Sequence, residues 1–462
     1  MPLRWSSNSH QPTRYDICSP RSAHWTATTS APHPDAHARR GAIPAAGLAQ
    51  RLSSHSTTAP AATAKEIVAG KLAQFARSRR ELAHALAQRH QVEVSGDVER
   101  FFAAVESGNW EDIEARFKKI NGGDSSAGYS GKRPPGTEHL WPAIIDAYGA
   151  AEQVHEWPAQ QLLDYGNAVL DSLRTGMVYV GGTDNGRWIP KLLNDTSDGE
   201  PHIILTQNAL ADSTYLDYLR LQYDDRLTNL SDADSQRAFQ DYVADAEKRL
   251  RHDQEHPDEP SQIRPGEEVR LVDGKVQVSG QVAVMAINEK LLETLRAKNP
   301  DLTFALQESF PLQGTYAQAA PLGPLMELGA QDGGNGLTAE QAAQSLDYWR
   351  HTAQQILADP AAAGSPSALK SYSHDTVAAA NLLAAHNFTG EAEQAYRLAT
   401  RLWPENPESM YGLAGLLARS GRAAEAQQML TDFARQNPDQ QAAAERASAA
   451  TRLVAPAPKP GP

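Results

Sequence analysis

The chain matches itself at a spacing of 34 residues near its carboxyl end. Asn387 aligns with Gly421, and both residue types tolerate a left-handed turn between helices. Other positions recur at the same spacing: Ala380 with Ala414, Leu383 with Leu417, Glu391 with Glu425, Ala392 with Ala426, Tyr396 with Leu430, Ala399 with Phe433, and Pro404 with Pro438. This combination of small residues, a turn and a helix-ending Pro predicts stacked pairs of helices. We expect two such units, over 373–406 and 407–440, and a capping helix over 441–454.

The pattern resembles the tetratricopeptide repeat, in which small residues let two helices pack closely and a Pro fixes the turn into the next unit. Phe433 departs from it, because a small residue is usual at that position. The resemblance implies that the first helix of each pair lines a groove for a protein or peptide. It places four residues there, and each of them could equally be an ordinary surface residue: His374, Asn381, Tyr411 and Arg419.

The centre of the chain alternates short apolar runs with helical patterns. Two apolar runs, 177–182 and 202–207, flank a helix that opens near Arg187, and such a β-α-β unit predicts parallel strands. Asp273-Gly274 between two alternating runs predicts a β-hairpin. Further strands are expected over 302–309 and 324–331. We therefore expect an α/β domain over 137–332 with a small, mostly parallel, Rossmann-like sheet, in a chain that is predominantly helical.

The remaining segments complete the expected domain organisation. Helical patterns occupy 63–120, a Gly/Ser/Pro linker follows over 121–136, and 338–372 is a helical connector to the repeats. Residues 1–62 and 455–462 have the composition of disordered tails.

The compartment is only loosely constrained. No stretch resembles the apolar core of a secretory signal, so a cytoplasmic location is the default expectation. The Arg-rich, acid-poor bias of residues 1–62 leaves two alternatives open, a targeting segment or an over-extended translation start. An extracytoplasmic location is the alternative if the chain begins later.

The turn after the first central strand is the best candidate for a ligand site. Its glycines would let backbone N–H groups approach a phosphorylated or sugar-like molecule at the start of the next helix. It lacks both the dinucleotide fingerprint and the P-loop Lys, and an ordinary tight corner uses the same residue types. The second strand ends in polar residues that would face the same crevice. The candidate ligand-binding residues are Gly181, Gly182, Thr183, Asp184, Asn185, Gly186, Arg187, Thr206, Gln207 and Asn208.

The segment "GGTDNGRW", followed by a helix, a strand and "TQNALADSTYLDYLR", resembles the soluble extracytoplasmic module of bacterial membrane proteins related to protein O-mannosyltransferases. The resemblance covers about 177–330 and implies that Asp184 and Asn185 hold the ligand-facing turn positions, with Arg187 beside them. The complete chain resembles an uncharacterised bacterial family of tetratricopeptide-repeat proteins. Neither resemblance carries an activity.

Charge and missing motifs narrow the possible functions. The chain has 43 Lys and Arg against 56 Asp and Glu, a net charge of −13, so we expect no nucleic-acid partner. No run is long enough to span a membrane. The motifs of zinc, disulfide-exchange and serine-nucleophile sites do not occur, and we expect neither a metal nor a cofactor.

Two functions remain from the sequence. The first is a protein–protein interaction scaffold that uses the repeats. The second is a ligand-binding or enzymatic α/β domain at the 181–187 turn. The sequence does not decide whether the chain is an enzyme.

Overall fold

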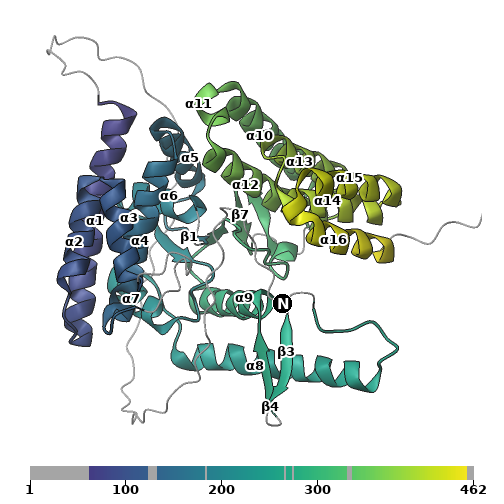
Figure 1. Ribbon diagram of the computed structural model, residues 1–462, viewed down its shortest axis with the longest axis horizontal. Coiled ribbons are helices and arrows are strands. Elements are labelled where there is room, and N and C mark those ends of the chain that lie inside the picture. Colours follow the sequence, from purple (N-terminus) through teal and green to yellow (C-terminus); the bar gives the residue numbers. More distant parts are fainter. Residues whose placement is uncertain are drawn as a thin grey trace, which may run out of the picture.

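The structure of the chain is a computed structural model that describes residues 62–122, 133–182, 185–264, 267–272, 275–329 and 336–454. Helices predominate and gather around a small sheet (Figure 1). The expected predominance of helix with a small α/β part is therefore confirmed. None of the described helices is long and apolar enough to cross a membrane.

Five helices form the amino-terminal side of the molecule: α1 (Ala64–His90), α2 (Gly96–Ser107), α3 (Trp110–Ile120), α4 (Thr137–Glu156) and α5 (Ala159–Ser172). Helix α1 begins with a capping box in which Thr63 and Glu66 each bond the other's backbone N–H. Phe75 of α1 and Phe101 of α2 belong to the same hydrophobic core as Val178 of the sheet. The linker expected over 121–136 therefore does not separate two cores, and its residues 123–132 lie outside the described ones.

The main sheet has the order β2-β1-β5-β7-β6, formed by β1 (Val178–Gly181), β2 (Ile203–Thr206), β5 (Phe304–Leu306), β6 (Ala320–Leu322) and β7 (Leu325–Leu328). Strand β1 pairs in parallel with β2, Val178 opposite Ile203, and with β5 on its other side. The expected parallel β-α-β unit is thus confirmed. Strand β7 runs antiparallel to β5, and β6 antiparallel to β7. The sheet is mixed rather than mostly parallel, and the three-residue strand β6 is not predicted by the sequence.

Alternate residues of the sheet enter two cores, because successive side chains of a strand point to opposite faces. Val178 and Val180 face the large core, whereas Tyr179 packs with Val169 of α5. The helices that follow the first strands are α6 (Asn185–Asn194), α7 (Ser213–Tyr223) with the short 3-10 turn Asp224–Arg226, and α9 (Gln281–Lys298). Both β1 and β2 are buried along their whole length.

Helix α8 (Asp232–Glu255) and the strands β3 (Glu268–Val272) and β4 (Lys275–Ser279) form an arm at the bottom of Figure 1. Strands β3 and β4 pair antiparallel, with Val272 opposite Lys275, which confirms the two strands of the expected hairpin. The hairpin is a separate two-stranded sheet. The turn residues 273–274 lie outside the described residues.

The carboxyl-terminal helices lie at the upper right of Figure 1 and comprise α10 (Ala339–Ala358), α11 (Pro360–Ala363), α12 (Pro366–Ala385), α13 (Thr389–Leu402), α14 (Pro407–Arg419), α15 (Ala423–Gln436) and α16 (Gln441–Val454), with a 3-10 turn at Pro438–Gln440. The pairs α12–α13 and α14–α15 carry the residues that repeat in the sequence. Ala380 and Ala414 are both fully buried, and Asn387 and Gly421 both adopt positive φ, 65° and 80°. The repeating positions therefore occupy equivalent places in two helix pairs. Helix α12 begins before residue 373 and extends into the expected connector.

Candidate functional site

The carboxyl ends of three parallel strands meet at one edge of the sheet. Strand β1 lies between β2 and β5, so the chain leaves β1 for one neighbour and later returns to its other side. Ligands of open α/β sheets bind where the strand order reverses in this way. The sequence predicts a site between the ends of β1 and β2, whereas the strand order reverses between β1 and β5. This adds Gln307 and Glu308, which directly follow β5, to the candidate site.

Gln307 makes hydrogen bonds to several residues at this end of the sheet. Its side-chain amide donates to Tyr165 Oη at 2.5 Å and to Asp375 Oδ1 at 2.7 Å, and Tyr165 donates to Asp375 Oδ2 at 2.9 Å. The hydroxyl of Tyr179 contacts both Gln307 and the carbonyl of Gly186. A Cβ on Gly186 would lie 2.2 Å from the Gln307 amide oxygen. The glycine is needed for this close approach, as a structural corner requires.

The predicted ligand-binding residues mostly bond other parts of the protein. Gly181 accepts a hydrogen bond from the Gln207 N–H at 2.6 Å, and the Thr206 N–H donates to Tyr215 Oη at 2.7 Å. The Gln207 side chain bridges to the segment after β5, since it donates to the Phe310 carbonyl at 2.9 Å. Asn208 is buried. Thr183 and Asp184 lie outside the described residues, as does the side chain of Asn185, whose backbone begins α6.

Arg187 points away from the crevice into the protein. Its Nε donates to the Gly182 carbonyl at 2.6 Å and its NH1 group to Asp146 Oδ1 at 2.7 Å. It belongs to a set of buried charges that we call the Asp146 network: Arg79, Asp146, Arg187, Lys191 and Asp195, with the hydroxyls of Tyr218 and Tyr223. The five charged side chains are between 2 and 7% exposed.

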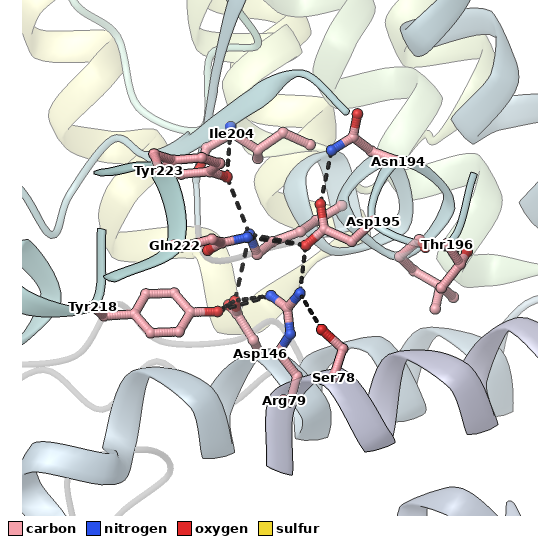
Figure 2. A network of polar contacts seen from close by, with 12 residues as sticks. Ser78, Arg79, Asp146, Asn194, Asp195, Thr196, Ile204, Tyr218, Gln222 and Tyr223 are labelled. Carbon is pink, nitrogen blue, oxygen red and sulfur yellow. Dashed lines mark hydrogen bonds and ion pairs between the residues drawn. The ribbon is translucent and has the colours of Figure 1, made fainter. Parts of the chain in front are cut away.

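The Asp146 network joins Arg79 of α1 and Tyr218 of α7 to Asp146 of α4 and to Asp195, which directly follows α6 (Figure 2). Arg79 of α1 lies between Asp195, at 2.6 Å, and the Tyr218 hydroxyl, at 2.8 Å. Lys191 of α6 is 3.4 Å from Asp195 and 3.7 Å from Asp146. Removing one partner from a buried ion pair typically destabilises a protein by about 3–5 kcal/mol, because the other charge is left unpaired. The network therefore holds α1, α4, α6 and α7 in one arrangement.

The charges of the network fix its protonation. Burial alone would raise the pKa of Asp146, but Arg187, Lys191 and Arg79 lower that pKa to about 2. Burial raises the pKa of Tyr218 well above its usual value. At neutral pH Asp146 and Asp195 are therefore ionised, Arg79 and Arg187 are charged, and both hydroxyls are neutral. These groups do not exchange a proton near pH 7, so the network has a structural role.

A second polar cluster lies where α12 covers the segment that follows β5. We call it the Glu308 cluster, and it consists of Glu308, Tyr316, His374, Asn381, Tyr396 and Glu408. The Glu308 carboxylate accepts hydrogen bonds from the Tyr316 hydroxyl and from Asn381 Nδ2, the latter at 3.2 Å. Tyr396 donates to Asn381 Oδ1 at 2.6 Å. Glu308 is only 3% exposed, and burial raises its pKa to about 7.

The four residues predicted to line the groove fall into two pairs. His374 and Asn381 contact the body of the same chain: His374 Nε2 lies 2.8 Å from the Glu308 carbonyl, and Asn381 bonds its side chain. Tyr411 and Arg419 belong to α14. Arg419 is exposed, and Tyr411 packs edge-on against Phe433 with a buried hydroxyl that makes no hydrogen bond among the described residues.

A small cavity of about 10 Å³ lies between the end of β5 and helices α10 and α12, beside Gln307 and the Glu308 cluster. It is lined in part by Gln307, Glu308, Asp375 and Trp349. The Trp349 indole N–H is buried and has no hydrogen-bond partner within the described ranges. A cavity of this size holds about one water molecule, which the indole N–H and the carboxylates could bind.

Sequence reasoning missed Gln307, Glu308 and Asp375. A signal for the first two was present, because polar residues directly follow a buried strand in "LQES", as they do after β2. Asp375 gives no such signal. It lies within a helix, and its role depends on how α12 packs on the sheet.

In the part of the chain that the structure describes, no group of three or more His, Cys, Asp or Glu side chains is placed to hold a metal ion. Comparisons of the chain with protein-family models, curated proteins and solved structures find no match.

Proposed function

We propose that the chain is a polypeptide-binding scaffold protein whose carboxyl-terminal helix pairs act as tetratricopeptide-like repeats. The observation that carries this proposal is that α12 already holds an irregular segment of the same chain, residues 308–316. His374 and His386 approach the carbonyls of Glu308 and Tyr316 at 2.8 and 2.7 Å. Hydrogen bonds to backbone carbonyls recognise the main chain of a polypeptide and not one particular side chain. Peptide-binding proteins use main-chain hydrogen bonds in the same way.

In the second helix pair, α14 packs against α12, α13 and α16, and the part of its surface at Arg419 is exposed. Helix α14 corresponds to α12 at the 34-residue spacing, and Arg419 on it is exposed. The buried hydroxyl of Tyr411, on the same helix, has no partner among the described residues. A buried hydroxyl without a hydrogen bond is unfavourable, so a partner that supplied an acceptor would gain affinity. We infer that a segment of another protein binds across Tyr411 and Arg419.

The test is selection of 12-residue peptides from a random display library on the full-length chain, followed by Kd measurements with selected peptides. Arg419→Glu should weaken their binding at least tenfold, which is about 1.4 kcal/mol. Tyr411→Phe should weaken it about fivefold, as expected for one neutral hydrogen bond. Arg435→Glu makes the same charge change on the exposed side of α15 and serves as the control.

The control variant should bind within twofold of the wild type. Failure to select any peptide would contradict the proposal. So would selected peptides that bind Arg419→Glu and Arg435→Glu equally well, because their site would then lie elsewhere.

A second function, binding of a phosphorylated or sugar-like ligand at the 181–187 turn, is favoured by one charge observation. The Asp146 network holds three cations, Arg79, Arg187 and Lys191, against two carboxylates. Of these cations, Arg187 lies in the first turn of α6 and bonds the Gly182 carbonyl, at a helix end that itself favours an anion. The ligand would contact backbone N–H groups of the turn, since the Arg187 side chain already bonds Asp146.

Thermal shift of the full-length chain with nucleotides and sugar phosphates tests this second function. A ligand that binds the turn should raise the melting temperature of the wild type and of the exposed-loop control Asp198→Ala, but not that of Asp184→Ala. If every compound leaves the wild type unchanged, or shifts Asp184→Ala equally, the turn is only a structural corner.

A further inference from the structure

The contact between α12 and the segment 308–316 contains the groups of a pH-sensitive switch. Glu308 and His374 both lie in this contact, and each is placed so that its protonation changes the strength of the contact. The Asp146 network, by contrast, contains no group with these properties. This inference rests on the proposed function, since it concerns what covers the polypeptide-binding face of α12.

His374 lies between two hydrogen-bond acceptors. Its Nδ1 lies 2.8 Å from a carboxylate oxygen of Glu408, and its Nε2 lies 2.8 Å from the backbone carbonyl of Glu308. Both partners are acceptors. A neutral imidazole carries one N–H and can donate only one of these bonds, whereas the imidazolium donates both. The contact in this structure is therefore complete only when His374 is protonated.

Glu308 is the second titratable group in this contact. Its carboxyl group is buried under α12 and is surrounded by hydroxyl and amide groups, from Tyr316 and Asn381, with no Lys or Arg bonded to it among the described residues. The other titratable groups near it are His374, Glu408 and Tyr396. Arg419 lies close enough to affect Tyr396. An ionised carboxylate without a bonded cation is unfavourable in such a place.

Burial is the main cause of the raised pKa of Glu308, about 7, and the bonds from Tyr316 and Asn381 only partly oppose it. The folded pKa thus lies above the ordinary value near 4.5. The covered state binds more protons than a state in which segment 308–316 has left α12. By linkage, the contribution of Glu308 to covering is fully present below about pH 4.5 and is lost as the pH rises through the folded pKa of about 7.

We propose that segment 308–316 is a proton-controlled cover of the α12 binding face. Acid closes it through Glu308 and His374, and a rise of pH toward 8 releases it and exposes His374, Asn381 and His386 to a polypeptide partner. The device is an autoinhibitory contact within one chain.

Hydrogen exchange measured by mass spectrometry on the full-length chain tests the cover without any partner. The segment has protected amides to follow, since Thr315 N–H bonds the Leu312 carbonyl and Ser309 N–H bonds Gln207. Protection factors, corrected for the intrinsic pH dependence of exchange, are compared at pH 6 and pH 8. Linkage from the folded and ordinary pKa values predicts protection about tenfold lower at pH 8.

Glu308→Gln should abolish this dependence, because Gln remains neutral at both pH values. Glu327→Gln, which changes a carboxyl group on β7 that pairs with Arg174, is the matched control and should behave as the wild type. Helix α4 supplies the internal reference in every sample. If Glu308→Gln does not fold, His374→Gln replaces it and should lower protection at pH 6 but not at pH 8.

Equal protection of wild-type 308–318 at the two pH values would overturn the proposal, and this measurement needs no variant. An unchanged pH dependence in Glu308→Gln would also overturn it. These exchange measurements use no partner, so they test only the cover. The peptide selection tests the proposed function separately, and its failure would not contradict the cover.

Discussion

The Asp146 network and the Glu308 cluster both join parts of the chain that lie far apart in sequence, but they balance charge differently. In the Asp146 network three cations surround two carboxylates, and the pKa of Asp146 falls to about 2. In the Glu308 cluster the buried carboxyl has only hydroxyl and amide donors, and its pKa rises to about 7. Both sites are buried, so the difference comes from the bonded partners and not from exposure.

This difference assigns different tasks to the two regions. The carboxylates and hydroxyls of the Asp146 network do not titrate near neutral pH, so the contact between α1 and the body does not change there. A cluster whose carboxyl titrates near pH 7 can respond to a small change of pH. The Asp146 network thus holds the amino-terminal helices in place at all pH values near neutral, whereas the contact between α12 and segment 308–316 changes with pH.

Removing one charge from the Asp146 network should lower the stability of the protein more than any other change considered below. Asp146→Asn leaves Arg79, Arg187 and Lys191 buried with Asp195 alone, which should lower the free energy of unfolding by about 3–5 kcal/mol. Urea denaturation at pH 7 measures this. Asp198→Asn changes an exposed loop carboxylate and should remain within about 0.5 kcal/mol of the wild type. Equal effects of the two variants would show that the network does not stabilise the fold.

Acid should reduce the contribution of the Asp146 network to stability. The folded pKa of Asp146 is lowered, so its contribution to stability is present above the unfolded value of 3.8 and is lost as the pH falls toward about 2. The loss should be about 2 kcal/mol between pH 5 and pH 2. Comparing urea denaturation of the wild type with that of Asp146→Asn over this range isolates it. The variant should show a shallower loss, and parallel curves would be contrary to our account.

The smallest effect should follow from breaking an exposed ion pair between the two helix pairs. Arg397 lies 2.7 Å from Glu393 and 3.2 Å from Glu425, and its side chain is 48% exposed. Water and salt screen such pairs, so Arg397→Ala should change the free energy of unfolding by less than about 0.5 kcal/mol. A loss as large as that of Asp146→Asn would mean that burial does not distinguish the two kinds of contact.

The sequence predicts those parts of the fold that depend on local patterns. The helix pairs follow from the 34-residue spacing, and the turn positions Asn387 and Gly421 adopt the positive φ that their residue types allow. The parallel pairing of β1 and β2 follows from a strand, helix and strand in sequence. In each case residues close in sequence determine the structure.

Contacts between distant residues escaped prediction. Arg187 appears beside a ligand-like turn in sequence, yet it pairs with Asp146, 41 residues earlier. The covering of α12 by segment 308–316 depends on how two helix pairs pack on a sheet, which no local period encodes. Strand β6 is only three residues long and contains Pro321, so it lacks the alternating pattern that predicts a strand.

The burial of Glu308 under α12 can be measured by titrating its carboxyl group in the intact chain, by NMR of protein labelled with ¹³C at glutamate side chains. Glu308→Gln identifies the resonance by its disappearance. If segment 308–316 is held against α12 as described, this carboxyl titrates with a pKa of about 7. A pKa near the ordinary value of 4.5 would show that the group is in water, and that the inner face of α12 is not covered by its own chain.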